Sequence, residues 1–197
     1  MKVFIGCEES QVVCQAFRKL GHEAYSCDLV PTRGNPDWHI QGDVMEVIER
    51  GWDLAILHPD CTAMSNSGNR WYGKGMPRHA ERIAALVWTE KLWVQAHCCA
   101  KHIAMENPIS VLWGVVKRSQ YIHPYEFGHM ETKATGLALH NLPLLKPTND
   151  VKDEMGKLPP KQKHKTWYAS PGPNRKRDRS VTFTGIANAM AEQWSEL

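Results

Sequence analysis

Apolar residues occur along the chain in short runs that alternate with segments of helical spacing. The first run, 3–5, ends at Gly6, and the segment 10–20 repeats apolar residues at intervals of three and four, which predicts a helix. Gly21 follows as a helix-ending glycine. A second apolar run closes on Asp28, so the opening of the chain predicts a β-α-β unit.

The same alternation continues towards the C-terminus. The long segment 79–100 predicts a helix that carries Ile83, Leu86, Val87 and Val94 on one face. Strands that alternate with helices predict an α/β fold, in which a mostly parallel sheet carries helices on both faces. The other expected elements are strands at 52–57, 101–105, 120–122 and 135–140 and helices at 45–50 and 186–194.

The length of 197 residues allows one well-buried core, so we expect a single domain over 1–197. No apolar run has the length of a signal peptide core or a membrane span, which favours a cytoplasmic protein without a membrane partner. The six cysteines lack the spacing of a disulfide framework and are expected to be free thiols. No metal site is expected, because His97, Cys98 and Cys99 point in different directions on one helix.

Positive charge is concentrated near the C-terminus, although the net charge of +3 is mild. The segment 157–179 contains many Lys and Arg residues, opposed only by Asp178, together with Pro, His and Gly. This composition predicts an exposed basic loop that contacts phosphates. A solvated surface loop without a partner is the alternative.

Chemically active side chains follow several of the predicted strands. Asp28, Asp43, Cys61 and Glu106 lie at strand ends or just beyond them. In folds with a parallel sheet, ligands bind at the carboxyl ends of the strands. Cys61 therefore lies where chemistry is expected, rather than where a core cysteine would be.

The order of these strand ends resembles the cytosine carbon-5 DNA methyltransferases. It is more closely similar to the short, phage-type DNA-methylase-like proteins that keep the catalytic domain and little else. This resemblance implies a Rossmann-like methyltransferase fold over most of the chain. The motifs that carry it are Phe4-Ile5-Gly6-Cys7-Glu8, Asp28, Gly42-Asp43-Val44, His58-Pro59-Asp60-Cys61, Met105-Glu106-Asn107-Pro108 and Thr184-Gly185-Ile186-Ala187-Asn188-Ala189.

The resemblance implies that Cys61 is the nucleophile that adds to carbon-6 of cytosine and that Glu106 stabilises the activated ring. It also implies that S-adenosylmethionine is the cofactor and DNA the substrate. Asp28 then accepts from the ribose and Asp43 from the adenine amine, while Asp43 is equally suited to cap the following helix. The residues expected to bind the cofactor are Gly6, Cys7, Glu8, Asp28, Asp43, Val44 and Asn188.

The chain departs from the family pattern at three places. Asp60 stands where the family has a proline, and its charge is expected to disfavour the Cys61 thiolate unless Arg70, Arg78 or another cation offsets it. Lys133 is the nearest basic residue to the place of a missing Gln-x-Arg-x-Arg motif. The segment 141–180 is expected as a reduced basic insertion in place of a large target-recognition region.

The loop 62–78 is expected to close as a flap on a flipped base or a nucleotide. Two other readings stay open: an enzyme acting on deoxycytidylate, and a non-catalytic descendant that binds nucleic acid or cofactor. The residues expected to bind substrate are Asn66, Arg70, Arg78, Lys133, Arg175 and Arg177.

Overall fold

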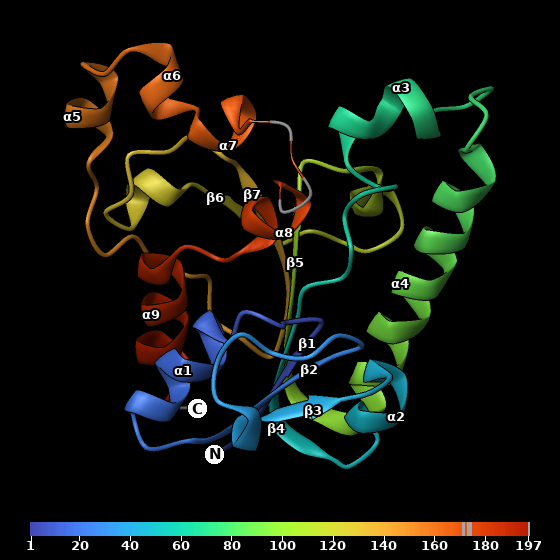
Figure 1. The fold of residues 1–197 in the computed structure, drawn as a ribbon. Coiled ribbons are helices and arrows are strands. Elements are labelled where there is room, and N and C mark those ends of the chain that lie inside the picture. Colours follow the sequence, from blue (N-terminus) through green and yellow to red (C-terminus); the bar gives the residue numbers. More distant parts are fainter. Residues whose placement is uncertain (171, 173–174, 197) are drawn as a thin grey trace.

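The computed structural model of the protein describes residues 1–170, 172 and 175–196. Figure 1 shows a twisted sheet with helices on both faces. The strands are β1 (Lys2–Gly6), β2 (Glu23–Asp28), β3 (His39–Gln41), β4 (Trp52–Leu57), β5 (Ala100–Pro108), β6 (Gln120–Ile122) and β7 (Thr135–His140). The helices are α1 (Val12–Lys19), α2 (Val44–Ile48), α3 (Asn69–Tyr72), α4 (His79–Cys99), α5 (Lys152–Gly156), α6 (Pro160–Lys163), α7 (Lys165–Tyr168), α8 (Arg175–Ser180) and α9 (Thr184–Gln193).

The strands form one seven-stranded sheet in the order β3-β2-β1-β4-β5-β7-β6. Neighbours from β3 to β5 are parallel, while β7 runs antiparallel to both β5 and β6. The predicted α/β fold with a mostly parallel sheet is therefore confirmed. The pattern analysis missed β3, because the segment 39–41 carries a single apolar residue, Ile40, and so shows no apolar run.

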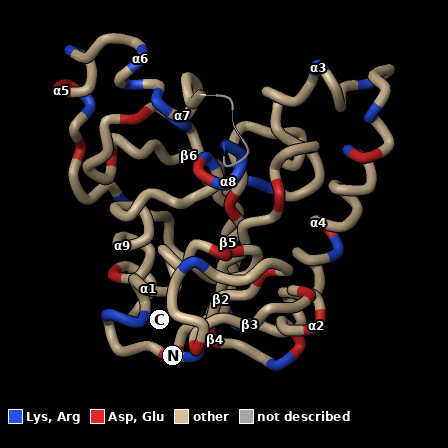
Figure 2. Tube along the Cα trace, viewed as in Figure 1, with Lys and Arg blue, Asp and Glu red and all other residues tan. Residues whose placement is uncertain are grey.

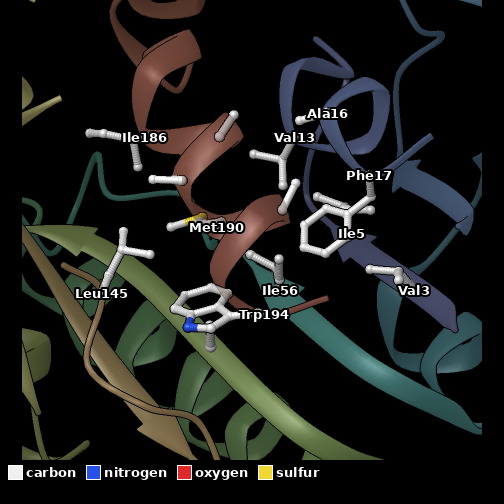
Figure 3. Close-up of a cluster of buried hydrophobic side chains, with 14 of the residues drawn as sticks. Val3, Ile5, Val13, Ala16, Phe17, Ile56, Leu145, Ile186, Met190 and Trp194 are labelled. Carbon is white, nitrogen blue, oxygen red and sulfur yellow. The ribbon is translucent and has the colours of Figure 1, made fainter. Parts of the chain in front are cut away.

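Two hydrophobic cores, one on each face of the sheet, follow from the alternation of side chains along the strands. In β1, Val3 and Ile5 belong to the core under α1 and α9, where Met190 and Trp194 complete it (Figure 3). Phe4, which lies between them in sequence, belongs to the opposite core. That second core is covered by α2 and α4, so the central strands are buried on both faces.

The predicted apolar face of the long helix is wrong for three of its four residues, since only Leu86 packs against a core. Ile83, Val87 and Val94 are 48%, 46% and 59% exposed, respectively. The stripe of α4 that packs inwards contains Leu92 and Ala96 instead, which are fully buried. The reason is that neighbouring elements cover the side of α4 that carries these two residues, a choice that helical spacing does not determine.

The basic segment of the back third is not a continuous loop, since α6, α7 and α8 all lie within it. Many of its cations are exposed as predicted, and Figure 2 shows Lys and Arg along the trace over these helices. Residues 171, 173 and 174, which belong to the predicted insertion, lie outside the described part of the chain.

All six cysteines are free, as predicted. Among the described residues, no helix is both long and apolar enough to cross a membrane. The same residues contain no group of three or more His, Cys, Asp or Glu side chains placed to hold a metal ion.

Candidate active site

The loops that follow β1, β4 and β5 meet at the carboxyl edge of the sheet, because these strands are parallel neighbours. The amide of His58 donates to the carbonyl of Gly6 at an N···O distance of 2.9 Å, which sets the two loops side by side. The strand order changes direction between β1 and β4, where ligands of such folds bind. Cys7 stands at this point with φ of 60°, a conformation uncommon outside glycine.

The segment 58–65, here called the cysteine loop, is held from two sides by buried side chains. The Asn107 amide donates from Nδ2 to the carbonyl of Pro59 at 3.1 Å. The Arg82 guanidinium, on α4, donates to the carbonyls of Ala63 at 2.7 Å and Ser65 at 3.2 Å. These contacts fix the position of Cys61 relative to β5 and α4.

Cys61 is half-buried, and its thiol is held in the neutral form by its surroundings. Burial raises the pKa of the Cys61 thiol most, and the negative charges of Glu106 and Asp60 raise it further. The positive charge of Lys133 lowers it. The predicted effect of Asp60 on Cys61 therefore has the expected direction, but burial and Glu106 act more strongly.

Glu106, at the end of β5, is directed towards His58, with the Nδ1 and Oε2 atoms 3.3 Å apart. Only 16% of the Glu106 side chain and 9% of the His58 side chain are exposed. Burial alone would raise the pKa of Glu106, but the hydrogen bond with His58 and the charge of Lys133 bring it below its usual value. The carboxyl group is therefore ionised at neutral pH.

Lys133 lies close enough to Cys61 and Glu106 to lower the pKa of both groups. Its ammonium donates to the carbonyl of Arg179 on α8 at 3.0 Å. Arg179 in turn faces Cys61, whose charge acts on the pKa of the guanidinium. The cations next to the thiol are thus Lys133 and Arg179, whereas Arg70 and Arg78 do not contribute to its pKa shift.

Asp60 is paired with a cation of α8. Its Oδ2 atom lies 2.9 Å from Nζ of Lys176, and its Oδ1 atom accepts from the hydroxyl and the amide of Thr62. Burial opposes ionisation, but these hydrogen bonds lower the pKa of Asp60 below its usual value. Asp178, also on α8, lies 3.9 Å from Arg33 in the loop after β2. Through these two contacts α8 spans the carboxyl edge above the central strands (Figure 1).

The acids predicted to bind cofactor gather around Cys7. Burial raises the pKa of the Cys7 thiol first, and Asp28, Asp60 and Asp43 all raise it through their charges. Asp43 caps α2, since its Oδ1 atom accepts from the Met45 amide at 2.9 Å. The capping role considered for Asp43 is thus present, and its other carboxylate oxygen accepts no hydrogen bond from the described residues.

Gly6 and Val44 are in close contact with each other. A Cβ atom on Gly6 would lie 2.7 Å from Cγ2 of Val44 and 2.9 Å from Cδ2 of Leu57, so glycine is required by the packing of β1. Glu8 is buried, and its carboxylate accepts from the amides of Val13 at 2.7 Å and Cys14 at 3.2 Å. Within the described residues, the Glu8 carboxylate thus stabilises the first turn of α1 by accepting from its free amides.

The first group of predicted substrate residues lies beyond the cysteine loop. Asn66 and Arg70 are exposed, whereas Arg78 is paired with Glu81 through two contacts of 2.7 Å. The expected flap is not a uniform loop, because it contains α3 and is held at Asn69, whose Oδ1 atom accepts from Arg82 at 2.8 Å.

The second group lies near the C-terminus. Arg175 donates to the carbonyls of Ala169 at 2.8 Å and Trp167 at 3.4 Å, so it holds the turn after α7. Arg177 is exposed on α8. Asn188 is exposed on α9, and within the described residues no hydrogen bond joins it to the acids near Cys7.

Sequence reasoning missed several residues of the site. His58 stands in the quoted motif but was given no role, although a histidine three residues before the candidate nucleophile is a usable signal. Arg82 and Arg179 carry no local signal, because each reaches the site from a separate helix. Asn107 lies within the Glu106 motif, and its position next to the candidate Glu106 is a usable signal.

Two cavities border the site. One of about 300 Å³ lies between the cysteine loop and α4, and one of about 430 Å³ lies behind Lys133. Neither is lined by Asp28 or Asp43. The residues of the first are Asp60, Thr62, Ala63, Tyr72, Arg78, Glu81, Ala85, Trp88, Thr89 and Lys176.

Comparisons with known proteins add a likeness in fold. No protein-family model and no curated protein matches the chain. Among solved structures, a candidate DNA modification methyltransferase encoded within a prophage (E. coli) aligns over 80% of this chain with 12% identity and a TM-score of 0.44. This chain spans 55% of that protein's length. A likeness at this level carries no argument about activity.

Proposed function

We propose that the protein is a methyltransferase that acts on carbon-5 of cytosine in DNA and uses S-adenosylmethionine. The observation that carries this proposal is the meeting of Cys61 and Glu106 at the ends of adjacent parallel strands, with Lys133 beside both. Carbon-5 of cytosine is a weak nucleophile, and a thiol that adds to carbon-6 together with a carboxyl group at the ring nitrogen is the pair that activates it.

In the proposed mechanism Cys61 first loses its thiol proton to solvent. The resulting thiolate adds to carbon-6, which places negative charge on the ring. Lys133 favours the thiolate by its positive charge. Glu106 faces ring nitrogen 3 and the exocyclic amine, and it passes a proton to the nitrogen as the charge develops. Because the Glu106 carboxyl is ionised at neutral pH, that proton reaches it from a neighbour, and His58 is its hydrogen-bonded partner.

S-adenosylmethionine, when bound, supplies an electrophilic methyl group. Afterwards the carbon-5 proton passes to solvent, the bond between sulfur and carbon-6 breaks, and the thiolate of Cys61 is released. Ring nitrogen 3 returns its proton to Glu106 as the ring recovers its aromatic form. His58 holds the Glu106 carboxyl in place throughout, and Asn107 holds the cysteine loop through the carbonyl of Pro59.

The residues near Cys7 fit the polar groups of this cofactor. Asp28 accepts one hydrogen bond, from the Val30 amide at 3.2 Å, and its second oxygen accepts none within the described residues. The same holds for Asp43, so each acid keeps an oxygen for a ribose hydroxyl or an adenine amine. Both lie beside the switch point of the sheet, where the ligands of related folds bind.

The test is methyl transfer from labelled S-adenosylmethionine to duplex DNA, single-stranded DNA and deoxycytidylate in separate reactions. We expect labelled DNA with the wild-type protein and none with Cys61→Ala, which should still bind the cofactor. Cys98→Ala is the matched control, because this thiol is exposed at the end of α4. A DNA strand with 5-fluorocytosine should trap the wild-type protein covalently, since fluorine cannot leave as a proton does.

Three outcomes would contradict the proposal. Full activity of Cys61→Ala would exclude the covalent mechanism. Cofactor binding without methyl transfer to any cytosine substrate would favour a non-catalytic binding protein, and efficient methylation of deoxycytidylate with none of DNA would change the substrate class.

A further inference from the structure

The larger cavity, of about 430 Å³, lies against the cation that the proposed mechanism uses. Its size falls within the range of about 300–1,000 Å³ that is common for ligand pockets. Lys133 belongs both to its lining and to the surroundings of Cys61 and Glu106. The lining residues are Glu131, Thr132, Lys133, His164, Thr166, Trp167, Tyr168 and Arg179.

Two exposed aromatic side chains form one wall of this cavity. Trp167 is 65% exposed and Tyr168 is 50% exposed, both on α7. Exposure of large aromatic side chains to water is unfavourable in free energy unless a partner covers them. Neighbouring aromatic side chains beside cations are typical of proteins that stack unpaired bases. This wall is therefore suited to a planar, partly apolar ligand.

The aromatic wall is held firmly by a buried acid. Glu131, only 4% exposed, accepts from the Thr166 amide at 2.7 Å and the Thr166 hydroxyl at 2.9 Å. Its other oxygen accepts from the Thr132 amide at 2.8 Å. Both carboxylate oxygens are thus bound to α7 and the segment before β7, so Glu131 serves as an anchor for the wall.

The lining of the cavity also carries two cations, Lys133 and Arg179. The Nζ atom of Lys133 has one hydrogen bond within the described residues, to the carbonyl of Arg179. The Nε atom of Arg179 is buried and has no partner among those residues. An ammonium and a guanidinium with free donors beside an aromatic wall match a phosphate joined to a base.

We propose that this cavity holds one unpaired nucleotide of a DNA strand, with its base stacked on the wall formed by Trp167 and Tyr168. The phosphate of this nucleotide lies at Lys133 and Arg179. The inference rests on the proposed function, because Lys133 connects the cavity to the cytosine site. It implies that the nucleotide next to the target cytosine is unpaired, and hence that the substrate is a single strand or a locally opened duplex.

The test uses the full chain and short fluorescent DNA strands with one cytosine, measured by fluorescence anisotropy without methyl transfer. The series consists of strands that each carry a single abasic position, placed on one side or the other of the cytosine. For the wild-type protein we expect one abasic position to weaken binding roughly 5- to 100-fold, the range of a single base–aromatic stack. We expect Trp167→Ala to weaken binding of the intact strand similarly and to be insensitive to that abasic position.

Tyr121→Ala is the matched control, because Tyr121 is an exposed aromatic residue on β6 outside the cavity lining. Arg179→Gln tests the phosphate side and should weaken binding of intact and abasic strands alike. Equal responses of the wild-type protein and Trp167→Ala to every abasic position would overturn the proposal, as would equal affinity for a fully paired duplex.

This test separates the inference from the proposed function. Stacking that depends on Trp167, combined with no methyl transfer to any DNA, would leave the cavity assigned and the methyltransferase proposal rejected. Methyl transfer that depends on Cys61, combined with no effect of Trp167→Ala on binding, would support the methyltransferase proposal and reject the assignment of the cavity.

Discussion

At the scale of single residues, the chemistry of Cys61 depends on how two acids and two cations are placed around one thiol. Glu106 and Asp60 disfavour the thiolate, and Lys133 favours it. Asp60 is 60% exposed and already paired with Lys176, so solvent and a cation both weaken its effect. The aspartate at position 60 is therefore compatible with a reactive thiol at Cys61.

We predict that Asp60→Asn lowers the pKa of the Cys61 thiol by less than about one unit, because an exposed charge is worth at most about 1 kcal/mol. Methyl transfer should rise with pH as the thiolate forms, and the variant should show this rise at lower pH. The rate of alkylation of the Cys61 peptide, followed by mass spectrometry across pH, measures the shift. Asp37→Asn, at an exposed site on another loop, is the control, and an unchanged or raised pKa in Asp60→Asn would contradict the prediction.

At the scale of elements, α4 positions the cysteine loop through one buried arginine. Arg82 is 6% exposed and gives all its described hydrogen bonds to Ala63, Ser65 and Asn69. A buried guanidinium is stable only when its donors are satisfied, and here the loop supplies the acceptors. The helix and the loop therefore stabilise each other.

We expect Arg82→Met to lower the free energy of unfolding by about 2–3 kcal/mol. This is the free energy lost when a buried charged group no longer forms its hydrogen bonds. Methionine keeps most of the volume but leaves the two carbonyls without their donor. Urea denaturation measures the loss, and limited proteolysis should show earlier cleavage within 62–78. Lys91→Met, exposed on the same helix, is the control. Equal stability of the two variants would mean that Arg82 does not hold the loop.

At the scale of the whole molecule, α3 and the helices α6 to α8 present cations on both sides of the carboxyl edge of the sheet (Figure 2). These cations differ in whether they are available to a polymer. Arg177 and Arg70 are exposed and form no ion pair within the described residues, whereas Arg78 is paired with Glu81 and Lys176 with Asp60. The available charge is thus smaller than the composition suggests.

We predict that affinity for single-stranded DNA falls with salt by about 0.7 log units per log unit of salt for each phosphate contacted. Arg177→Gln should reduce this slope by about one such contact, and Arg78→Gln should leave it nearly unchanged because the guanidinium already has an acid as partner. Anisotropy titrations at several salt concentrations measure both slopes. A shallow slope for the wild-type protein, or an equal loss in the two variants, would count against a polymeric substrate.

The sequence by itself determined the longer elements of the fold. Alternating apolar runs and helical spacing are local properties, so β1, β4, β5 and α4 could be predicted along with the positions of Cys61 and Glu106 at strand ends. The roles given to these two residues came from the resemblance of their motifs and remain proposals. Strand β3 carries one apolar residue, and the helices inside the basic segment are short and mostly polar, so neither shows a recognisable hydrophobic pattern.

Only the tertiary structure decided which distant residues meet. Lys176 reaches Asp60 across 116 positions of sequence, and Lys133 lies near both Cys61 and Glu106. Arg82 holds the cysteine loop, a role that its place in the sequence does not indicate. The inward face of α4 and the antiparallel direction of β7 were likewise set by the neighbouring elements. The physical reason is that periodicity reports which side chains share a face, whereas packing of the whole chain decides what that face meets.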